Sequence, residues 1–253
     1  MCTMTFFPET AGGTPRWIFF NRDEQRTRGR AEPPRLFNGR GGDYLMPVDP
    51  DSGGSWMGVH SNGFFLALIN NYPGDQIIRD PGMRSRGLLI RDLLESGRPP
   101  LHPDIERQIR NHEYAPFFLV LLGQRLTRAW EWDGSMITTL DVPGDRPGII
   151  SSSGIEHGRI TAQRKEQFQR FLGEAGGAGP QWDPKKFADF HRRTSSRRPD
   201  EAICMSRSDA HTVSISEICL DQNEALLHYY PDPPFTDPLS YGVAVQASSH
   251  PQN

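Results

Sequence analysis

An apolar run that ends in four polar residues constrains the fold of this chain more than any other feature. The run Trp17–Phe20 combines aromatic and β-branched residues, which is typical of a buried strand. The polar residues Asn21–Glu24 follow it directly. Charges at the mouth of a buried strand usually form a solvated turn, but here a second strand could hold them beside the chain terminus. We therefore expect either a simple turn or a polar cluster at one end of a sheet.

The second residue of the chain, Cys2, favours the cluster. A cysteine side chain is small, so methionine aminopeptidase is expected to remove Met1. Cys2 would then carry a thiol and a free α-amine, which is the combination that an N-terminal nucleophile needs. The amine, with an ordinary pKa of about 7.7–8.0, would be the nearest base to the thiol. The alternative is that cysteine at this position has no chemical role.

Length, charge and cysteine content exclude several classes of protein. The 253 residues suffice for one large domain with a full core, and the net charge of −3 does not suggest binding to nucleic acid. No apolar stretch approaches the length of a membrane span, and the first residues do not resemble a secretory signal. Three cysteines without metal-ligand spacing fit a reducing compartment, so we expect a cytoplasmic protein with no metal site and no cofactor.

The pattern of apolar residues predicts paired antiparallel strands with helices between them. Such a pattern suits two packed sheets covered by helices in a single domain of residues 1–253. From about residue 231 the chain is rich in proline and serine, and we expect an irregular tail with a weak strand at most. The expected elements are a hairpin at 59–69 turning at Asn62 and Gly63, a helix at 84–96, a hairpin at 117–132, a helix at 157–172, a short helix after Asp183, and strands at 201–205, 212–220 and 225–230.

Several motifs occur in the order typical of one family. Met1–Thr3 opens the chain, and the Asn-Arg-Asp-Glu motif of residues 21–24 follows. Residues 53–59, 85–87 and 114–117 complete the ordered set. The chain resembles the NRDE family, also called the Transport and Golgi organization protein 2 family, over most of its length. That family in turn resembles the N-terminal nucleophile hydrolases of the choloylglycine hydrolase and penicillin V acylase group. This resemblance implies a four-layer αββα sandwich.

The acylase resemblance also implies a set of catalytic residues. Cys2 matches the nucleophile, while Asn21 and Asp23 match polar residues near the end of an early strand. Asn71, in the sequence Asn-Tyr-Pro-Gly, matches the side-chain amide of the oxyanion hole. The arginine of the acylase pattern is displaced here to Arg22. If Arg22 lies near Cys2 it could lower the thiol pKa, whereas pairing with a neighbouring carboxylate would make it structural.

Other positions are candidates for binding. The acylases carry a second asparagine where this chain has a serine-rich segment ending in Ser153, so a hydroxyl stands in place of an amide. Arg207 is a candidate for a late arginine that reaches the nucleophile in the acylases. Trp56 and Arg86 lie in family motifs, but the residue type of Trp56 favours a core role, and Arg86 could be a solvated charge. His60 is the remaining candidate for ligand binding.

The resemblance implies cleavage of a non-peptide amide bond. Cys2 would attack, its α-amine would relay the proton, Asp23 would orient that amine and Asn71 would stabilise the oxyanion. The alternative is a non-catalytic binding protein on the same fold, because members of the family are linked to haem handling and lipid metabolism. His60 could then meet a haem iron. In either case the expected partner is a small-molecule substrate or ligand, and the sequence leaves open whether the chain forms a homo-oligomer.

Overall fold

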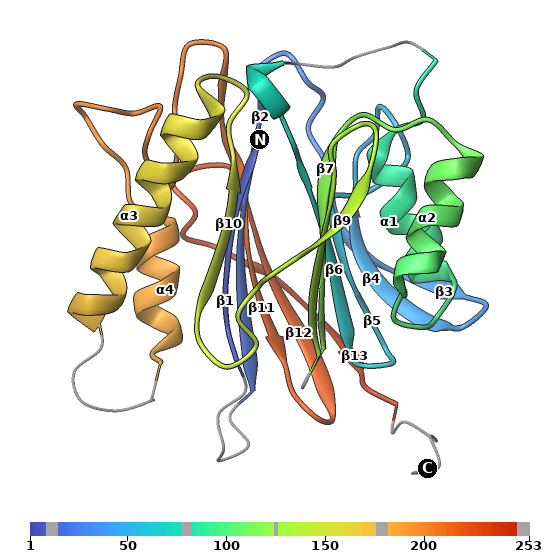
Figure 1. The fold of residues 1–253 in the computed structure, drawn as a ribbon. Helices are drawn as coiled ribbons and strands as arrows, with labels where there is room; N and C mark the ends of the chain where they lie inside the picture. Colours follow the sequence, from blue (N-terminus) through green and yellow to red (C-terminus); the bar gives the residue numbers. More distant parts are fainter. Residues whose placement is uncertain (9–14, 77–81, 124–125, 176–181, 247–253) are drawn as a thin grey trace.

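The computed structural model describes residues 1–8, 15–76, 82–123, 126–175 and 182–246, and in these residues two antiparallel sheets lie face to face (Figure 1). The first sheet has the strand order β10 (Gly148–Ser152), β1 (Cys2–Phe7), β2 (Arg16–Gln25), β11 (Ala210–Leu220), β12 (Glu224–Pro231) and β13 (Leu239–Ala244). The second has the order β3 (Glu32–Gly39), β4 (Gly42–Val48), β5 (Met57–His60), β6 (Phe64–Asn70), β7 (Phe117–Gly123), β8 (Thr127–Trp132) and β9 (Ile137–Leu140).

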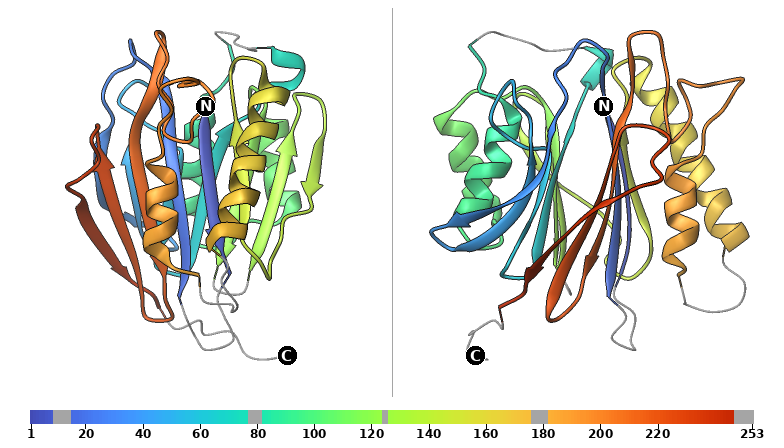
Figure 2. Two further views of the ribbon diagram at one scale, coloured as in Figure 1. Left: turned by 90° about the vertical axis from the view of Figure 1, so that its left-hand side faces the viewer. Right: turned by 180° about the vertical axis from the view of Figure 1, so that it is seen from behind.

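Helices cover the outer face of each sheet, which gives four layers (Figures 1 and 2). α1 (Arg86–Glu95) and α2 (His102–Asn111) lie on the second sheet, and α3 (His157–Ala175) and α4 (Pro184–His191) lie on the first. A short 3₁₀ helix, η1 (Pro73–Asp75), follows β6. The predicted αββα sandwich is therefore confirmed.

Side chains alternate between the two faces of each strand, and this alternation explains the layered arrangement. Successive side chains of a strand point to opposite faces, so each strand supplies two cores. In β1, Met4 and Phe6 enter the core between the sheets, whereas Phe7 enters the core beneath α3 and α4. Each of these side chains is at most 1% exposed. Burial of one such side chain contributes about 1.5–3 kcal/mol, so residue 2 is followed by a firmly anchored strand.

The polar motif of residues 21–24 lies inside a strand and not at its end. The expected strand of residues 17–20 is present, but β2 continues to Gln25. Because of this continuation, Asn21 and Asp23 face the helix layer, while Arg22 points into the space between the sheets. Flanking strands β1 and β11 pair with the motif on both sides and satisfy its backbone groups.

The chain after residue 231 also differs from expectation. β13 pairs with β12 over six residues, from Glu224 opposite Ala244 to Tyr229 opposite Leu239. Conversely, residues 201–205 do not form the expected strand. The segment is bound to the sheet by side-chain and isolated backbone hydrogen bonds, such as that from the Thr212 N–H to the Met205 carbonyl at 2.9 Å. Among the described residues, no helix combines the length and apolar character needed to cross a membrane.

Candidate active site at the chain terminus

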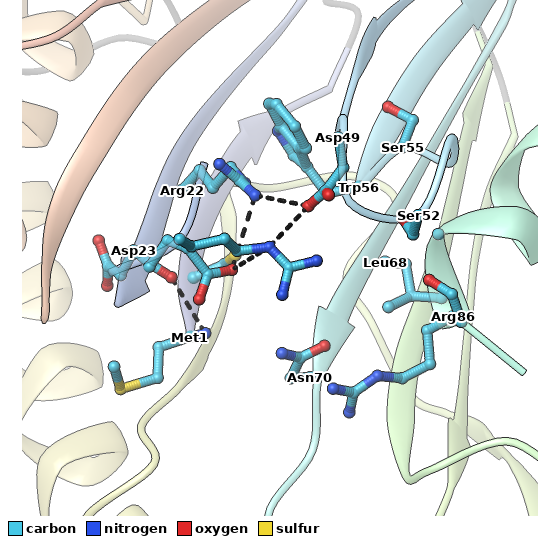
Figure 3. A pocket seen from close by; sticks show the side chains of 15 residues that line it. Met1, Arg22, Asp23, Asp49, Ser52, Ser55, Trp56, Leu68, Asn70 and Arg86 are labelled. Carbon is cyan, nitrogen blue, oxygen red and sulfur yellow. Dashed lines mark hydrogen bonds and ion pairs between the residues drawn. The ribbon is translucent and has the colours of Figure 1, made fainter. Parts of the chain in front are cut away.

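Strand pairing brings Cys2 beside the polar motif. In the register of β1 and β2, Cys2 lies opposite Arg22, and the N–H of Asp23 donates to the Met1 carbonyl at 3.0 Å. A pocket of about 110 Å³ opens at this point between the two sheets and the start of α1 (Figure 3). Its lining is Met1, Cys2, Arg22, Asp23, Glu24, Arg28, Asp49, Ser52, Ser55, Trp56, Leu68, Asn70, Ser85, Arg86 and Gly87.

Met1 occupies one side of this pocket. Its amine donates to the backbone carbonyl of Asp23 at 3.2 Å, and the Cys2 N–H donates to Ser152 Oγ at 3.3 Å. Burial alone would lower the pKa of the Met1 amine, but Tyr72, Cys2 and nearby carboxylates outweigh burial and raise this pKa to about 10. The surroundings of the chain terminus therefore favour a positively charged amine.

The Cys2 thiol is buried, with the residue 6% exposed. Burial raises the pKa of the thiol above its ordinary value, and the Asp23 carboxylate adds to this effect. The terminal amine, a hydrogen bond from the Asp23 backbone and the Arg22 charge oppose it and lower the pKa. Since the net shift is upward, the thiol is protonated at neutral pH and needs a base before it can attack.

The Asp23 carboxylate lies on the helix side of β2. Its Oδ1 accepts a hydrogen bond from Thr212 Oγ1 at 2.7 Å, and its Oδ2 lies 3.7 Å from Arg164 Nη1. Within the described residues Oδ2 has no hydrogen-bond partner. Burial raises the pKa of Asp23, and Arg164 is the strongest influence in the opposite direction. An acceptor is thus left open next to the chain terminus.

Arg22 is held by a carboxylate that the sequence reasoning missed. Its Nη2 lies 2.9 Å from Asp49 Oδ2 and 3.6 Å from Glu24, and its guanidinium stacks 4.2 Å from the centre of the Trp56 ring. Arg22 therefore has a structural ion pair, and it also lowers the pKa of Cys2. The two roles expected for Arg22, a structural ion pair and an effect on the thiol pKa, therefore occur together.

The adjacent asparagines at the end of β6 point to opposite sides. Asn71 Nδ2 donates to Glu131 at 2.7 Å, and its Oδ1 accepts the Tyr72 N–H at 2.8 Å, so this amide is turned away from the pocket. Asn70 lines the pocket, where its Nδ2 donates to Tyr72 Oη at 3.3 Å. The amide that lines the pocket is therefore that of Asn70, the last residue of β6, and not that of Asn71 as expected.

Two further expected catalytic or binding residues are engaged elsewhere. Asn21 lies beneath α4, where its Nδ2 donates to the carbonyls of His191 and Ile203 at 2.8 and 3.0 Å. Ser153 Oγ donates to the Ile155 carbonyl at 2.7 Å, and its neighbour Ser152 is the serine that contacts Cys2. Both expectations are therefore corrected. Asn21 shares the helix-side face of β2 with Asp23, but its amide is bound beneath α4, and Ser153 lies one residue beyond the serine that contacts Cys2.

Arg207 and His60 do not line the pocket. Arg207 pairs with Asp209 through both Nε and Nη2, at 2.9 and 2.7 Å. The His60 side chain is fully buried in the layer beneath α1 and stacks on Phe64 with ring centroids 4.9 Å apart. A haem cannot reach a ring enclosed in this way, so His60 is not an accessible iron ligand.

Trp56 and Arg86 line the pocket, and Trp56 also belongs to the core between the sheets. Arg86 begins α1, and its Nη1 donates to the Pro116 carbonyl at 2.8 Å. In Figure 3 its side chain lies beside Asn70, across the pocket from Met1. In the described part of the chain, no three His, Cys, Asp or Glu side chains are grouped as ligands for a metal ion.

The sequence matches one protein family over most of its length. The family Transport and Golgi organisation 2 matches residues 1–230. The chain belongs to this family. A search of curated protein sequences found no match for this member of the Transport and Golgi organisation 2 family.

Solved structures extend the comparison to enzymes of the N-terminal nucleophile hydrolase fold. This family member is similar to the Caenorhabditis elegans N-acylethanolamine-hydrolyzing acid amidase ortholog, with 13% identity and a TM-score of 0.56 over 86% of this chain and 92% of that one. It is also similar to the mutant C2A conjugated bile acid hydrolase from Clostridium perfringens, with 10% identity and a TM-score of 0.54 over 95% and 92% of the two chains. At these identities the likeness concerns the fold.

Sequence reasoning gave no indication of two residues of the site in this Transport and Golgi organisation 2 family member, Asp49 and Arg164. Asn70 and Ser152 are neighbours of residues that it singled out. Asp49 and Arg164 gave no signal, because a lone carboxylate after a strand and a lone arginine in a helix are ordinary surface residues in most proteins. Only their burial, with exposures of 6% and 1%, distinguishes them.

Proposed function

We propose that the protein is an N-terminal cysteine hydrolase that cleaves a non-peptide C–N bond of an amide. The observation that carries the proposal is the pocket at the chain terminus, into which Cys2 opens together with Asp23 and Asn70. A nucleophile and a neutral amide donor at one opening, with the buried Asp23 carboxylate on the helix side of β2 beside the chain terminus, are parts that acyl transfer requires. The fold shared with an acid amidase and a bile acid hydrolase supports the same class of reaction.

Removal of Met1 precedes the reaction and exposes the α-amine of Cys2. The α-amine of Cys2 then takes the thiol proton while Sγ attacks the carbonyl carbon of the amide. Collapse of the tetrahedral intermediate breaks the C–N bond, and the amine of Cys2 passes the proton to the leaving nitrogen. Water hydrolyses the resulting thioester, which releases a carboxylic acid and restores the thiol.

Asp23 has two roles in this scheme. Its carboxylate orients the α-amine of Cys2, which after loss of Met1 has protons to donate both to Ser152 Oγ, its present acceptor, and to the open Asp23 Oδ2. Its backbone N–H now donates to the Met1 carbonyl and is released when Met1 leaves. We assign this N–H and the Asn70 side chain as the two oxyanion donors, since a tetrahedral oxyanion is best stabilised by preorganised donors.

The test combines mass spectrometry with kinetics. Intact mass should show loss of Met1, and iodoacetamide near neutral pH should label Cys2 faster than Cys204 or Cys219, because Cys2 lines the pocket and the other two cysteines do not. Hydrolysis is then measured on a panel of N-acylethanolamines, N-acyl amino acids, penicillin V and conjugated bile acids. Cys2→Ala and Cys2→Ser should abolish turnover, while Cys219→Ala serves as the matched control and should retain it.

Two results would remove the nucleophile from the proposal. One is retention of Met1 together with faster labelling of Cys204 or Cys219 than of Cys2. The other is turnover that survives Cys2→Ala. Saturable ligand binding without any turnover on the panel would instead favour a non-catalytic binding protein on the same fold.

A further inference from the structure

A buried arginine of α3 reaches the site from the helix layer. The Arg164 side chain is 1% exposed, although arginine is almost never fully buried without a partner. Its Nη1 donates to Thr3 Oγ1 at 3.0 Å, to Ser151 Oγ at 3.2 Å and to the Ser152 carbonyl at 3.3 Å. Arg164 thus ties together the first residues of β1 and the end of β10, the two strands that flank the chain terminus.

The same guanidinium compensates the charge of Asp23. Both side chains are buried, and Nη1 lies 3.7 Å from Asp23 Oδ2, which has no hydrogen-bond donor among the described residues. A carboxylate removed from water remains ionised only when an opposite charge or several donors offset its desolvation. Besides Arg164, the groups that face Asp23 from its neighbouring elements are the Met1 amine, Cys2, Cys204, Arg207, His211 and the Thr212 hydroxyl.

Among these groups, Arg164 is the one that can compensate the charge of Asp23. Arg207 already forms a bidentate pair with Asp209, and burial lowers the pKa of His211, which favours its neutral form. The amine of Met1 is lost in the proposed function, and the Cys2 amine that replaces it must be neutral to take the thiol proton. Arg164 has no carboxylate within ion-pair distance other than Asp23 in the described part of the chain.

We propose that Arg164 is a positioning residue that keeps Asp23 ionised and fixes Ser152 beside the Cys2 nitrogen. Arg164 contacts neither the pocket nor the thiol and acts through these two residues. For the reaction, this inference rests on the proposed function, because an ionised Asp23 matters to catalysis only if the α-amine of Cys2 is the base. The ion pair itself can be tested without any substrate.

The experiment is a double-mutant cycle on the full chain, read as thermal stability between pH 4 and pH 8. The variants are Arg164→Met, Asp23→Asn and their combination, with Arg164→Lys as the conservative change. Arg170→Met is the matched control, because Arg170 lies on the exposed side of α3 and pairs there with Glu166. Intact mass of every variant establishes that all share the same N-terminus.

The expected result follows from the sign of the linkage. Without Arg164, the pKa of folded Asp23 rises further above its unfolded value, so the folded state is penalised when Asp23 ionises and is relieved when it is protonated. The Tm loss of Arg164→Met should therefore be smallest at pH 4 and grow as the pH rises. Asp23→Asn should recover most of that loss at pH 8, Arg164→Lys should recover part of it, and Arg170→Met should leave the profile unchanged.

A merely structural arginine gives a different pattern. A Tm loss of Arg164→Met that is equal at pH 4 and pH 8, and that Asp23→Asn does not reduce, would overturn the inference. If the wild type turns over a panel substrate, Arg164→Met should also move the acid limb of kcat to higher pH. Failure of the proposed function leaves the stability cycle intact, so the two failures are distinguishable.

Discussion

The two adjacent asparagines allow a sharp test of the oxyanion hole. Asn70→Ala removes the amide that lines the pocket, and Asn71→Ala removes the amide that faces Glu131. One preorganised oxyanion donor contributes about 2.7–4 kcal/mol to the transition state, which corresponds to about 10²–10³ in kcat. We expect this loss for Asn70→Ala, with little change in KM, and we expect Asn71→Ala to keep kcat within about threefold.

Stability should change in the opposite order. Asn71 is 4% exposed and makes two hydrogen bonds, of 2.7 Å to the Glu131 carboxylate and 2.8 Å from the Tyr72 N–H. A bond to a charged group contributes about 1.5–3 kcal/mol, so Asn71→Ala should lose about 2–3 kcal/mol. For a chain of this size that loss corresponds to about 4–12 °C in Tm. Asn70 makes one long bond of 3.3 Å, and Asn70→Ala should lose less than about 1 kcal/mol.

The assay is hydrolysis of a chromogenic acyl anilide or of the best panel substrate, with a thermal melt of each variant. Both variants should label at Cys2 with iodoacetamide at the wild-type rate, which checks that the nucleophile is intact. The reasoning is refuted if Asn71→Ala loses two orders of magnitude in kcat while Asn70→Ala retains its activity. Equal losses of kcat in both variants, with equal losses of Tm, would show that the effect is on folding.

Two further predictions concern buried charge. Asp49→Asn leaves Arg22 buried without its 2.9 Å partner and should destabilise the fold by about 3–5 kcal/mol in urea, whereas the control Asp51→Asn, at an exposed carboxylate, should change it by less than about 1 kcal/mol. Equal losses would contradict this. Burial lowers the pKa of His191 to about 3, so the unfolded chain binds a proton below about pH 6.5 and the folded chain does not. Stability should fall by up to about 1.4 kcal/mol per pH unit between pH 6 and pH 4, and His191→Gln should flatten this slope; an unchanged slope would show that other groups cause it.

The four layers were implied by the family resemblance, and the apolar pattern independently indicated two packed sheets covered by helices. The strand at residues 17–20 was recognisable from its apolar run, the hairpin from the turn residues Asn62 and Gly63, and the helix from His157 from its apolar face, and the structure contains each of them. β13 was underestimated because its residues are mostly exposed and its pairing with β12 depends on backbone groups, which carry no sequence signal. Backbone pairing of this kind is decided by tertiary context.

The errors in the site have one physical origin. Asn71 and Ser153 each lie one residue beyond the last residue of a strand, and in both cases that last residue, Asn70 or Ser152, is the one that reaches the site. A sequence motif predicts which segment of the chain lies near the site. The backbone conformation then determines which of two adjacent side chains points into the pocket. The polar residues 21–24 show the same effect, since their alternation sends Arg22 toward the pocket and Asn21 beneath α4.

Arg164 could not be predicted from the sequence for a different reason. It lies 141 positions beyond Asp23 in the chain, in a helix whose exposed face is rich in ordinary charges such as Glu166 and Arg170. Only the docking of α3 on β10 and β1 turns one of those charges inward, where it meets the Thr3 hydroxyl and the Asp23 carboxylate. The chemistry of the terminus therefore depends on a helix that carries no motif, and a change that loosened α3 should alter the ionisation of Asp23 before it altered the position of Cys2.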